Sequence, residues 1–386
     1  MINVTMLVFN SVYKDSRVLK EAESLSKNDC AVTIVGLDDG QETPTLELPF
    51  NIVLISVKSR KYRSKTLLPL KFMELIYRNY KLLMSQNIDV VHCHDIGPMI
   101  VAWLISARKK IPVVYDSHEL EYDRNTPSKT LKLFNRYYEK LFIGKASQII
   151  VSDGDFRANV MRDVHNIRAP MTYVRNCPPT VIDSKIHAID IKEKLGISKD
   201  SKIVLYVGHV IPGRGAIQTL ESLLHLPKEV VLLIVGTVRD NGKFQNTIDK
   251  LKLNERVFNI GPYPYKELVK YTVSADVGLC LIENTCLSYY HSTPTKLFDY
   301  IAAGVPALVS NFPAMNEIVQ NTPEGEIGIS VNPDDPVEIA NGIKMILGWD
   351  NEKRIAVKER MYNLHHSQYN WDSQEENLLS VYNKYR

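Results

Sequence analysis

The sequence predicts an α/β protein built from two domains, each with a doubly wound parallel sheet. A length of 386 residues is enough for two domains of ordinary size. Short apolar strands alternate with amphipathic helices twice along the chain, before and after a polar stretch at 175–190 that contains two prolines. Because 45% of the residues are hydrophobic, each half can bury a core of its own.

The first half begins with a strand–loop–helix–strand unit, and strands and helices then alternate. Strands are predicted at 4–9, 32–36, 51–57, 89–92, 113–116, 148–151 and 171–174, and helices at 16–26, 70–86, 99–107, 131–145 and 155–162. Parallel strands place ligands at their carboxyl ends. The segments expected there are 10–17, 92–97, 116–121 and 152–155.

The second half repeats this alternation. Strands are predicted at 203–208, 230–236, 257–260, 277–281, 306–310 and 328–331, and helices at 216–224, 244–251, 265–274, 294–303, 336–347, 351–364 and 372–385. We place a linker at 179–198, between a first domain at 1–178 and a second at 199–366.

Composition disfavours several classes of protein. The sequence has no run of about 18 apolar residues, so we expect no membrane-spanning helix. Its start enters a strand pattern at once, so we expect no signal peptide. The five cysteines are scattered and form no C-x-x-C pair, which indicates reduced thiols in a cytoplasmic protein without a zinc site.

Basic residues are concentrated in the first half, where residues 1–190 hold 26 Lys and Arg against 21 Asp and Glu. The excess is densest at 58–81, where eight cationic residues and one glutamate are interleaved with large apolar ones. Such a segment suits the anionic inner face of a membrane, or else is a solvated helix whose apolar side is core. Nucleic-acid binding is not expected, because no known module accompanies the charge.

One candidate anion site is the start of the helix in STPTKLFDYIAAGVP. Thr293 is the predicted N-cap, Pro294 the first helical residue, and Gly304 the end of the helix. A helix N-terminus attracts anions, and here Lys296 adds a positive charge. Asp299, one turn later, could accept hydrogen bonds from a sugar hydroxyl. The alternative is an ordinary capped surface helix.

A second candidate is the glycine-rich loop in YVGHVIPGRG. Gly208, Gly213 and Gly215 let the backbone approach a ligand closely, and Arg214 offers a fork of donors to phosphate oxygens. The loop matches neither a P-loop nor a G-x-G-x-x-G fingerprint. The alternative is a tight turn between a strand and a helix.

Histidines and carboxylates also follow strands of the first half. His118 comes just after a predicted strand, at the edge of the sheet where active-site residues of α/β proteins lie, although a single histidine is more often structural. The run His92, Cys93, His94 and Asp95 resembles a metal site. Adjacent strand residues point to opposite faces, so these four cannot all bind one ion, and no metal is expected.

Taken together, these motifs resemble those of the retaining glycosyltransferases of family 4, which have the GT-B fold. The resemblance covers essentially the whole chain. It rests on DSRVLKEAESL, VVHCHD, VVYDSHE, RNCPP, YVGHVIPGRG, VGLCLIE, STPTKLFDYIAAGVPAL and WDSQEENLLSVY.

The resemblance implies two Rossmann-like domains that face each other across a cleft, with the C-terminal helix at 367–386 crossing back to the first domain. The first domain would bind the acceptor and the second the nucleotide diphosphate of the donor. Closure of the domains would bring His118 to the donor hexose. The implied catalytic residues are His118, Arg214 and Lys296. The implied donor-binding residues are Gly208, His209, Gly213, Gly215, Gly236, Tyr263, His291, Ser292, Thr293, Thr295, Leu297 and Asp299, and the implied acceptor-binding residues are Asn10, Asp15, Ser16, Arg17 and Asp95.

Three departures from the family pattern leave the donor sugar and acceptor open. His291 stands where the family often has a glutamate eight positions before the second carboxylate, here Asp299. His209 replaces a second basic residue, usually arginine. The first loop reads NSVYKDSR and lacks the common Gly-Gly pair.

The resulting expectation is a retaining glycosyltransferase that moves a hexosyl group from a nucleotide-diphosphate sugar, with a UDP-sugar favoured. The acceptor would be a glycan or lipid-linked sugar of bacterial surface polysaccharide, and no metal or other cofactor would be needed. The alternatives are a sugar-nucleotide epimerase or hydrolase on the same fold, and a degenerate transferase that acts as a partner-binding subunit. The missing G-x-G-x-x-G argues against a nicotinamide-dependent dehydrogenase.

Overall fold

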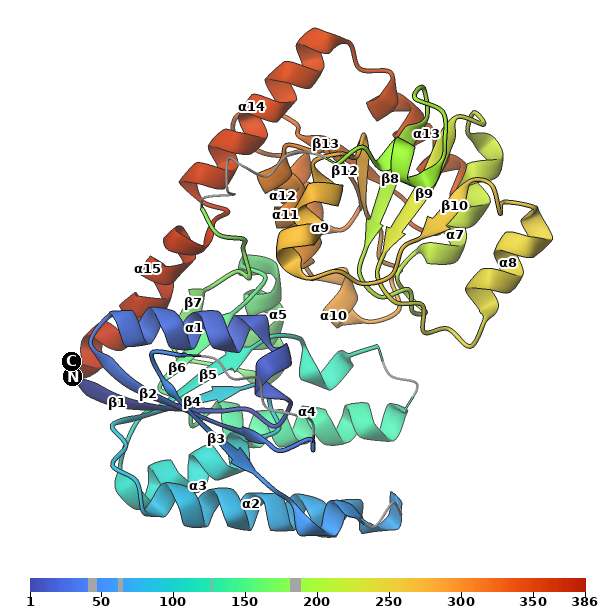
Figure 1. The fold of residues 1–386 in the computed structure, drawn as a ribbon. Helices are drawn as coiled ribbons and strands as arrows, with labels where there is room; N and C mark the ends of the chain where they lie inside the picture. The colour runs from blue at the N-terminus through green and yellow to red at the C-terminus, as the bar shows by residue number, and fades with distance from the viewer. Residues whose placement is uncertain (41–46, 62–64, 126–127, 181–188) are drawn as a thin grey trace. The chain divides into compact units, whose positions relative to one another are not determined.

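The computed structural model describes residues 1–40, 47–61, 65–125, 128–180 and 189–386 (Figure 1). The chain divides into two compact units: unit 1 is Met1–Asn176 with Gln374–Arg386, and unit 2 is Cys177–Ser373. Each unit has one parallel sheet with helices on both of its faces (Figure 1). The predicted fold class of two doubly wound α/β domains is confirmed.

Unit 1 is built on a seven-stranded sheet in the order β3-β2-β1-β4-β5-β6-β7. Its strands are β1 (Ile2–Leu7), β2 (Cys30–Leu37), β3 (Asn51–Ile55), β4 (Val90–His94), β5 (Val113–Ser117), β6 (Gln148–Val151) and β7 (Met171–Tyr173). Its helices are α1 (Ser16–Lys27), α2 (Leu68–Met84), α3 (Met99–Lys109), α4 (Lys129–Ile143) and α5 (Asp155–His165). The strand order reverses between β1 and β4, which makes the loops after these strands the favoured place for a ligand.

Local sequence explains how these two loops are shaped. Asp15 is the N-cap of α1, where its side chain accepts a hydrogen bond from the Val18 N–H at 3.3 Å. Asp95 follows β4 in the left-handed region, with φ 58°, which ends the strand abruptly. Figure 1 shows α1 and α5 on one face of the sheet and α2, α3 and α4 on the other.

The end of the chain belongs to unit 1. Helix α15 (Trp371–Tyr382) begins at the last residues of unit 2, and its remainder lies with unit 1. Asn28, the C-cap of α1, donates a hydrogen bond to Glu375 at 3.1 Å, and Tyr382 is fully buried against His92 of β4, with 2.6 Å between Oη and Nδ1. This segment therefore completes the unit 1 core.

Unit 2 has a six-stranded sheet in the order β10-β9-β8-β11-β12-β13. Its strands are β8 (Lys202–Val207), β9 (Val230–Val235), β10 (Val257–Asn259), β11 (Val277–Cys280), β12 (Ala307–Ser310) and β13 (Gly328–Val331). Its helices are α6 (Ile191–Leu195), α7 (Ala216–Ser222), α8 (Lys243–Leu251), α9 (Tyr265–Thr272), α10 (Leu287–Tyr290), α11 (Thr295–Ala303), α12 (Pro313–Val319), α13 (Pro336–Leu347) and α14 (Asn351–Ser367).

Several local predictions differ from the structure. Helix α6 lies inside the predicted linker, where Ile191 is buried in the unit 2 core, while residues 181–188 of that linker lie outside the described residues. Helix α11 starts at Thr295, one residue later than predicted, and Pro294 is its N-cap without a side-chain hydrogen bond. The predicted end at Gly304 is confirmed, with φ 67°. No helix among the described residues has the length and apolar character needed to cross a membrane.

Candidate functional site

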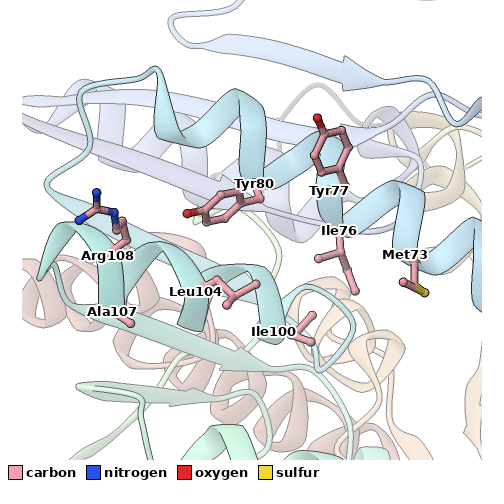
Figure 2. Close-up of a pocket in the computed structure, with 8 residues that line it drawn as sticks. All are labelled: Met73, Ile76, Tyr77, Tyr80, Ile100, Leu104, Ala107 and Arg108. Carbon is pink, nitrogen blue, oxygen red and sulfur yellow. The ribbon is translucent and has the colours of Figure 1, made fainter.

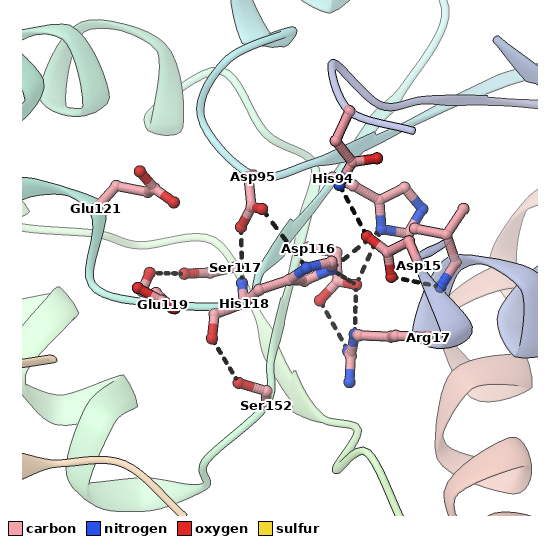
Figure 3. A network of polar contacts seen from close by, with 12 residues as sticks. Asp15, Arg17, His94, Asp95, Asp116, Ser117, His118, Glu119, Glu121 and Ser152 are labelled. Carbon is pink, nitrogen blue, oxygen red and sulfur yellow. Dashed lines mark hydrogen bonds and ion pairs between the residues drawn. The ribbon is translucent and has the colours of Figure 1, made fainter. Parts of the chain in front are cut away.

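The carboxyl edge of the unit 1 sheet carries a buried polar cluster centred on Asp116 (Figure 3). Both oxygens of this carboxylate accept hydrogen bonds from Arg17, at 2.9 Å from Nε and 2.8 Å from Nη2. The third donor of this guanidinium, Nη1, bonds to the Val174 carbonyl at 2.7 Å. Arg17 was predicted to contact an acceptor, but it is 4% exposed and lies among these partners. Its placement indicates a structural role beneath the site.

His118 lies on the exposed side of this cluster. Its Nε2 is 3.0 Å from Asp116 and its Nδ1 is 3.5 Å from Asp95, whose other oxygen accepts the backbone N–H of His118 at 3.2 Å. Burial by itself lowers the pKa of His118, but the two carboxylates outweigh burial and raise that pKa to about 10. At neutral pH the ring is therefore an imidazolium, and 18% of the side chain is exposed.

A deeper layer of the cluster holds groups that are neutral at pH 7. The rings of His92 and His94 stack with centroids 4.3 Å apart, and burial lowers the pKa of both. Glu21 lies 3.0 Å from Arg17 Nε and 3.7 Å from His92 Nε2. Burial and then the Asp116 charge raise the pKa of Glu21 to about 8. The charged groups of the cluster are therefore Arg17 and Asp116, together with His118 and its second partner Asp95.

The same layer has the residue types of a metal site. His92 and His94 point to the same face of β4, beside Glu21 of α1 and Asp116 of β5. One ligand atom from each of these four residues lies within 4.8 Å of the others. Cys93 points to the opposite face, into the core, as alternation predicts. Arg17 bonds Asp116 and lies 3.0 Å from Glu21, so a cation placed here would have to displace a buried guanidinium.

The loop after β1 contains the remaining residues predicted to contact an acceptor. Asn10 donates a hydrogen bond to Asp15 at 3.0 Å, and both side chains lie near the protein surface. Burial raises the pKa of Asp15, but the charge on His118 and the bond from Asn10 outweigh it and lower the pKa. Ser16 is exposed at the start of α1. Asn10, Asp15 and Asp95 therefore surround the exposed side of His118.

In unit 2 the loops after β8 and β9 approach each other closely. A Cβ added to Gly236 would lie 1.8 Å from the Gly208 carbonyl oxygen, so only glycine fits there. Gly215 has φ 64°, and a Cβ would meet Leu281 at 2.7 Å. His209 contacts Thr237 across the two loops, with 2.5 Å between Nδ1 and Oγ1. These contacts hold the segment from Gly208 to Gly215 in one shape.

Two cations, Arg214 and Lys296, are held against aromatic rings in unit 2. The Arg214 guanidinium lies 4.5 Å from the Tyr289 ring centroid, and its Nε donates to the Tyr289 hydroxyl at 3.2 Å. The Lys296 ammonium lies 4.2 Å from the Tyr206 ring centroid. Burial and the nearby charge of Arg214 lower the pKa of Lys296 to about 8, although Cys280 by itself would raise this pKa. Within the described part of the chain, neither cation forms an ion pair with a carboxylate.

The start of α11 lies in the same region of unit 2. Thr293 is buried and Thr295 is exposed, whereas the Leu297 side chain belongs to the core and its N–H donates to the Pro294 carbonyl at 2.9 Å. Ser292 bonds to the Tyr289 carbonyl at 2.9 Å, and the His291 ring packs edge-on against Tyr290. In the first turn of this helix Thr295 is therefore exposed, whereas Lys296 is buried with its ammonium against Tyr206.

Asp299 has Tyr265 as a hydrogen-bonded neighbour. Tyr265 donates a hydrogen bond from its hydroxyl to Asp299 at 3.2 Å. Tyr263, which was predicted to bind the donor, packs on Tyr271 with ring centroids 4.9 Å apart and lies near Lys194. The structure thus makes Tyr265 the aromatic residue of this loop that adjoins Asp299, the residue predicted to bind a sugar hydroxyl.

Several residues of both clusters were not predicted. In unit 1 they are Glu21, Asp116 and Tyr382, together with His92 and His94, which were considered only as metal ligands, and in unit 2 they are Tyr206 and Tyr289. The spacing of Arg17 and Glu21 on one helix and of His92 and His94 on one strand could have indicated the unit 1 group. No local signal marks Tyr382, because its partner is 290 positions away.

Two family models match consecutive parts of the chain. Residues 16–177 match the model described as "Glycosyltransferase Family 4", and residues 188–363 match "Glycosyl transferases group 1". An uncharacterized glycosyltransferase of Methanocaldococcus jannaschii is 22% identical over 94% of this chain and 91% of its own length. The UDP-Gal:alpha-D-GlcNAc-diphosphoundecaprenol alpha-1,3-galactosyltransferase of Escherichia coli is 20% identical over 80% of this chain and 78% of its own.

Solved structures share the fold of this chain. Sucrose-phosphate synthase from Thermosynechococcus elongatus superimposes with a TM-score of 0.82 at 17% identity, covering 100% of this chain and 99% of the other. HepE of Anabaena, solved in complex with UDP and glucose, has a TM-score of 0.74 at 14% identity and covers both chains fully. Both likenesses place the two parallel sheets in the GT-B fold.

Proposed function

The chain is a glycosyltransferase of the GT-B fold, of the family 4 and group 1 type, and we propose that it transfers a hexosyl group from a nucleotide-diphosphate sugar with retention of configuration. The observation that carries the proposal is the pair of cations in unit 2, Arg214 and Lys296, packed on tyrosine rings without carboxylate partners among the described residues. Such a pair has the charge that a diphosphate requires.

The two cations would act mainly on the leaving group. As the bond from the sugar to the diphosphate breaks, negative charge develops on the departing phosphate oxygen. Arg214 and the protonated form of Lys296 stabilise this charge, and the tyrosine rings hold both groups in place beforehand. The first turn of α11 adds its dipole. This account uses no metal ion.

Asp299 and Tyr265 would bind the nucleoside part of the donor. A carboxylate accepts the two hydroxyl hydrogens of a ribose, and Asp299 already accepts one hydrogen bond from Tyr265. The exposed ring of Tyr265 offers a stacking surface for the base. UDP is the favoured nucleotide, since the Anabaena structure holds UDP and the E. coli relative is named for UDP-galactose.

His118 would contribute a positive hydrogen-bond donor at the sugar. Its imidazolium is fixed by Asp95 and Asp116 and keeps part of its surface exposed. Such a group can donate a charged hydrogen bond to a hydroxyl of the donor sugar. Asn10 and Asp15, beside it on the same unit, would bind the acceptor.

We further propose a glycan or lipid-linked acceptor in bacterial surface polysaccharide synthesis, with the protein peripheral on the inner face of the membrane. The supporting observations are the basic, partly apolar helix α2 and the undecaprenol-linked substrate in the name of the E. coli relative. Residues 62–64 of the basic segment at 58–81 lie outside the described residues. A degenerate, partner-binding subunit is disfavoured because Arg214 and Lys296 are both present and supported.

A thermal-shift panel tests the donor assignment. A ligand that binds the folded state raises the melting temperature, so UDP-, GDP- and ADP-sugars are compared at equal concentration. We expect the largest shift with a UDP-sugar, and its loss in Arg214→Ala. Lys353→Ala, a change at an exposed lysine of α14 in the same unit, is the matched control and should keep the shift. A panel without any shift in the wild-type protein would contradict the donor assignment.

A further inference from the structure

An apolar groove opens between α2 and α3 on the surface of unit 1 (Figure 2). Its volume of about 750 Å³ is within the usual range of small-molecule sites. The side chains along it come from both helices and are mainly apolar: Met73, Ile76 and Tyr77 from α2, and Ile100, Leu104 and Ala107 from α3. The charged side chain that lines it is Arg108, at the end far from Met73 and Ile100 (Figure 2). The lining therefore favours a hydrocarbon ligand.

The other end of this groove adjoins the proposed acceptor loop. Phe72, next to Met73 on α2, contacts Phe9 edge-on with ring centroids 6.3 Å apart. Phe9 directly precedes Asn10, and a Cβ added to Gly97, three residues before Ile100, would lie 3.4 Å from the Phe9 ring. A molecule bound at Asn10 and Asp95 could thus continue into the groove without leaving unit 1.

The helix layer that contains the groove is cationic. Helices α2, α3 and α4 lie on one face of the sheet and together carry nine Lys and Arg residues against two Glu (Figure 1). Glu139 is buried against Tyr115 and His165, and Glu74 is bonded to Arg78 and to backbone N–H groups at 58 and 59. The charge of this layer is complementary to phosphate-bearing lipids.

Helix α4 adds exposed apolar side chains to the same layer. The exposed large apolar residues of α4 are Leu131, Leu133, Phe134, Tyr137 and Leu141. They are interleaved along the helix with Lys129, Lys132, Arg136 and Lys140. Aromatic and basic side chains in this mixture suit the boundary between headgroups and acyl chains of a membrane. A groove in this layer would face the membrane, which holds any lipid-linked substrate.

We propose that the groove between α2 and α3 binds the hydrocarbon chain of the acceptor lipid, while the phosphate and sugar of that lipid lie at Asn10 and Asp95. This inference rests on the proposed lipid-linked acceptor. The chain enters beside Met73 and Ile100 and runs toward Arg108, whose methylene stem covers its far end. Burial of chain methylenes supplies binding free energy that is independent of the sugar.

Farnesyl phosphate is the probe, used below its micelle concentration with the full-length protein. Its affinity is compared in the wild type, in Ala107→Trp, which fills the end of the groove beside Arg108, and in Ala107→Ser, which leaves the groove open. Ala107 is exposed, so neither change disturbs the core. We expect Ala107→Trp to weaken binding at least about tenfold and Ala107→Ser less than about twofold. A diazirine at the end of the farnesyl chain should label peptides of α2 and α3.

Three results would overturn the inference: labelling outside α2 and α3, equal affinity in the tryptophan variant, and binding to phosphatidylglycerol vesicles without binding to monomeric farnesyl phosphate. Self-association that Ala107→Trp abolishes, without farnesyl phosphate binding, would assign the groove to a second copy of the chain. UDP binding is measured in parallel on the same samples. Loss of farnesyl phosphate binding with UDP binding intact refutes the groove alone, whereas absent UDP binding refutes the donor assignment and leaves the groove result standing.

Discussion

The polar cluster of unit 1 and the cation pair of unit 2 differ in whether their charges have partners within the protein. In unit 1, Asp116 accepts hydrogen bonds from Arg17 and contacts His118 at 2.8–3.0 Å, and Asp95 lies 3.5 Å from His118, so two carboxylates balance the two cations. In unit 2, Arg214 and Lys296 face tyrosine rings, and no carboxylate among the described residues pairs with them. A satisfied cluster stabilises its own geometry, whereas unsatisfied positive charge requires an anion from outside.

The largest effect should come from breaking the satisfied cluster. Arg17→Met leaves Asp116 buried without its main partner, so the free energy of unfolding should fall by about 3–5 kcal/mol. Urea denaturation measures this change. The control is Lys14→Ala, which removes an exposed ion pair to Asp39 and should cost less than about 1 kcal/mol. Equal losses in the two variants would show that the buried cluster does not stabilise unit 1.

Substitution of either cation of unit 2 should lower the activity and leave the stability nearly unchanged. Arg214→Ala and Lys296→Ala should each lower kcat/KM about 10²–10³-fold, because each removes a donor aimed at the developing charge. Their melting temperatures should stay near that of the wild type, since neither side chain completes a buried ion pair. Steady-state kinetics and calorimetry on the same preparations measure both. Near wild-type kcat/KM in either variant contradicts the role of the pair.

His118→Ala should affect turnover more than nucleotide binding. Loss of a charged hydrogen bond is worth about 1.5–3 kcal/mol, so kcat/KM should fall about 10–10²-fold. UDP affinity should be unchanged, because the proposed nucleotide ligands all belong to unit 2. Titration calorimetry with UDP and kinetics with the full donor separate the two quantities. An equal loss in both would remove His118 from the proposed contact with the sugar.

Tyr382→Phe tests the contribution of the chain end to the unit 1 cluster. The substitution keeps the ring but removes the hydroxyl that lies 2.6 Å from His92 Nδ1, leaving a buried imidazole nitrogen without that partner. We expect unfolding to become easier by about 1–3 kcal/mol. The control is Tyr362→Phe, on an exposed face of α14, which should change stability little. Identical stability of the two variants would contradict this role.

The smallest predicted effect is a pH dependence of UDP binding. The pKa of Lys296 is lowered to about 8 in the free protein, so its positive charge is lost as the pH rises through 8. UDP affinity should therefore fall above pH 8, by at most about tenfold per pH unit. Lys296→Arg keeps its charge throughout and should give a flat profile. A wild-type profile that is flat between pH 7 and 9 would contradict this assignment.

Local patterns predicted much of the fold and part of the site. Alternating apolar segments located the strands of both sheets, because burial on both faces of a parallel sheet demands nearly continuous apolar runs. Glycine spacing marked the loop at 208–215, where Gly215 needs positive φ. The start of α11 was placed one residue early, because Thr293 resembles an N-cap but Pro294 occupies that position without a side-chain bond.

The sequence by itself determined the fold class and the alternation of strands and helices in each half. It also identified Arg214, Lys296, Asp299 and His118 as candidates, because each belongs to a short motif beside a strand or helix end. Only the tertiary structure decided which partners these residues have. Arg17 and Asp116 are 99 positions apart, and Tyr382 and His92 are 290 apart. Such contacts depend on the packing of distant elements, and so does the difference between a cation that is neutralised and one that is left for a ligand.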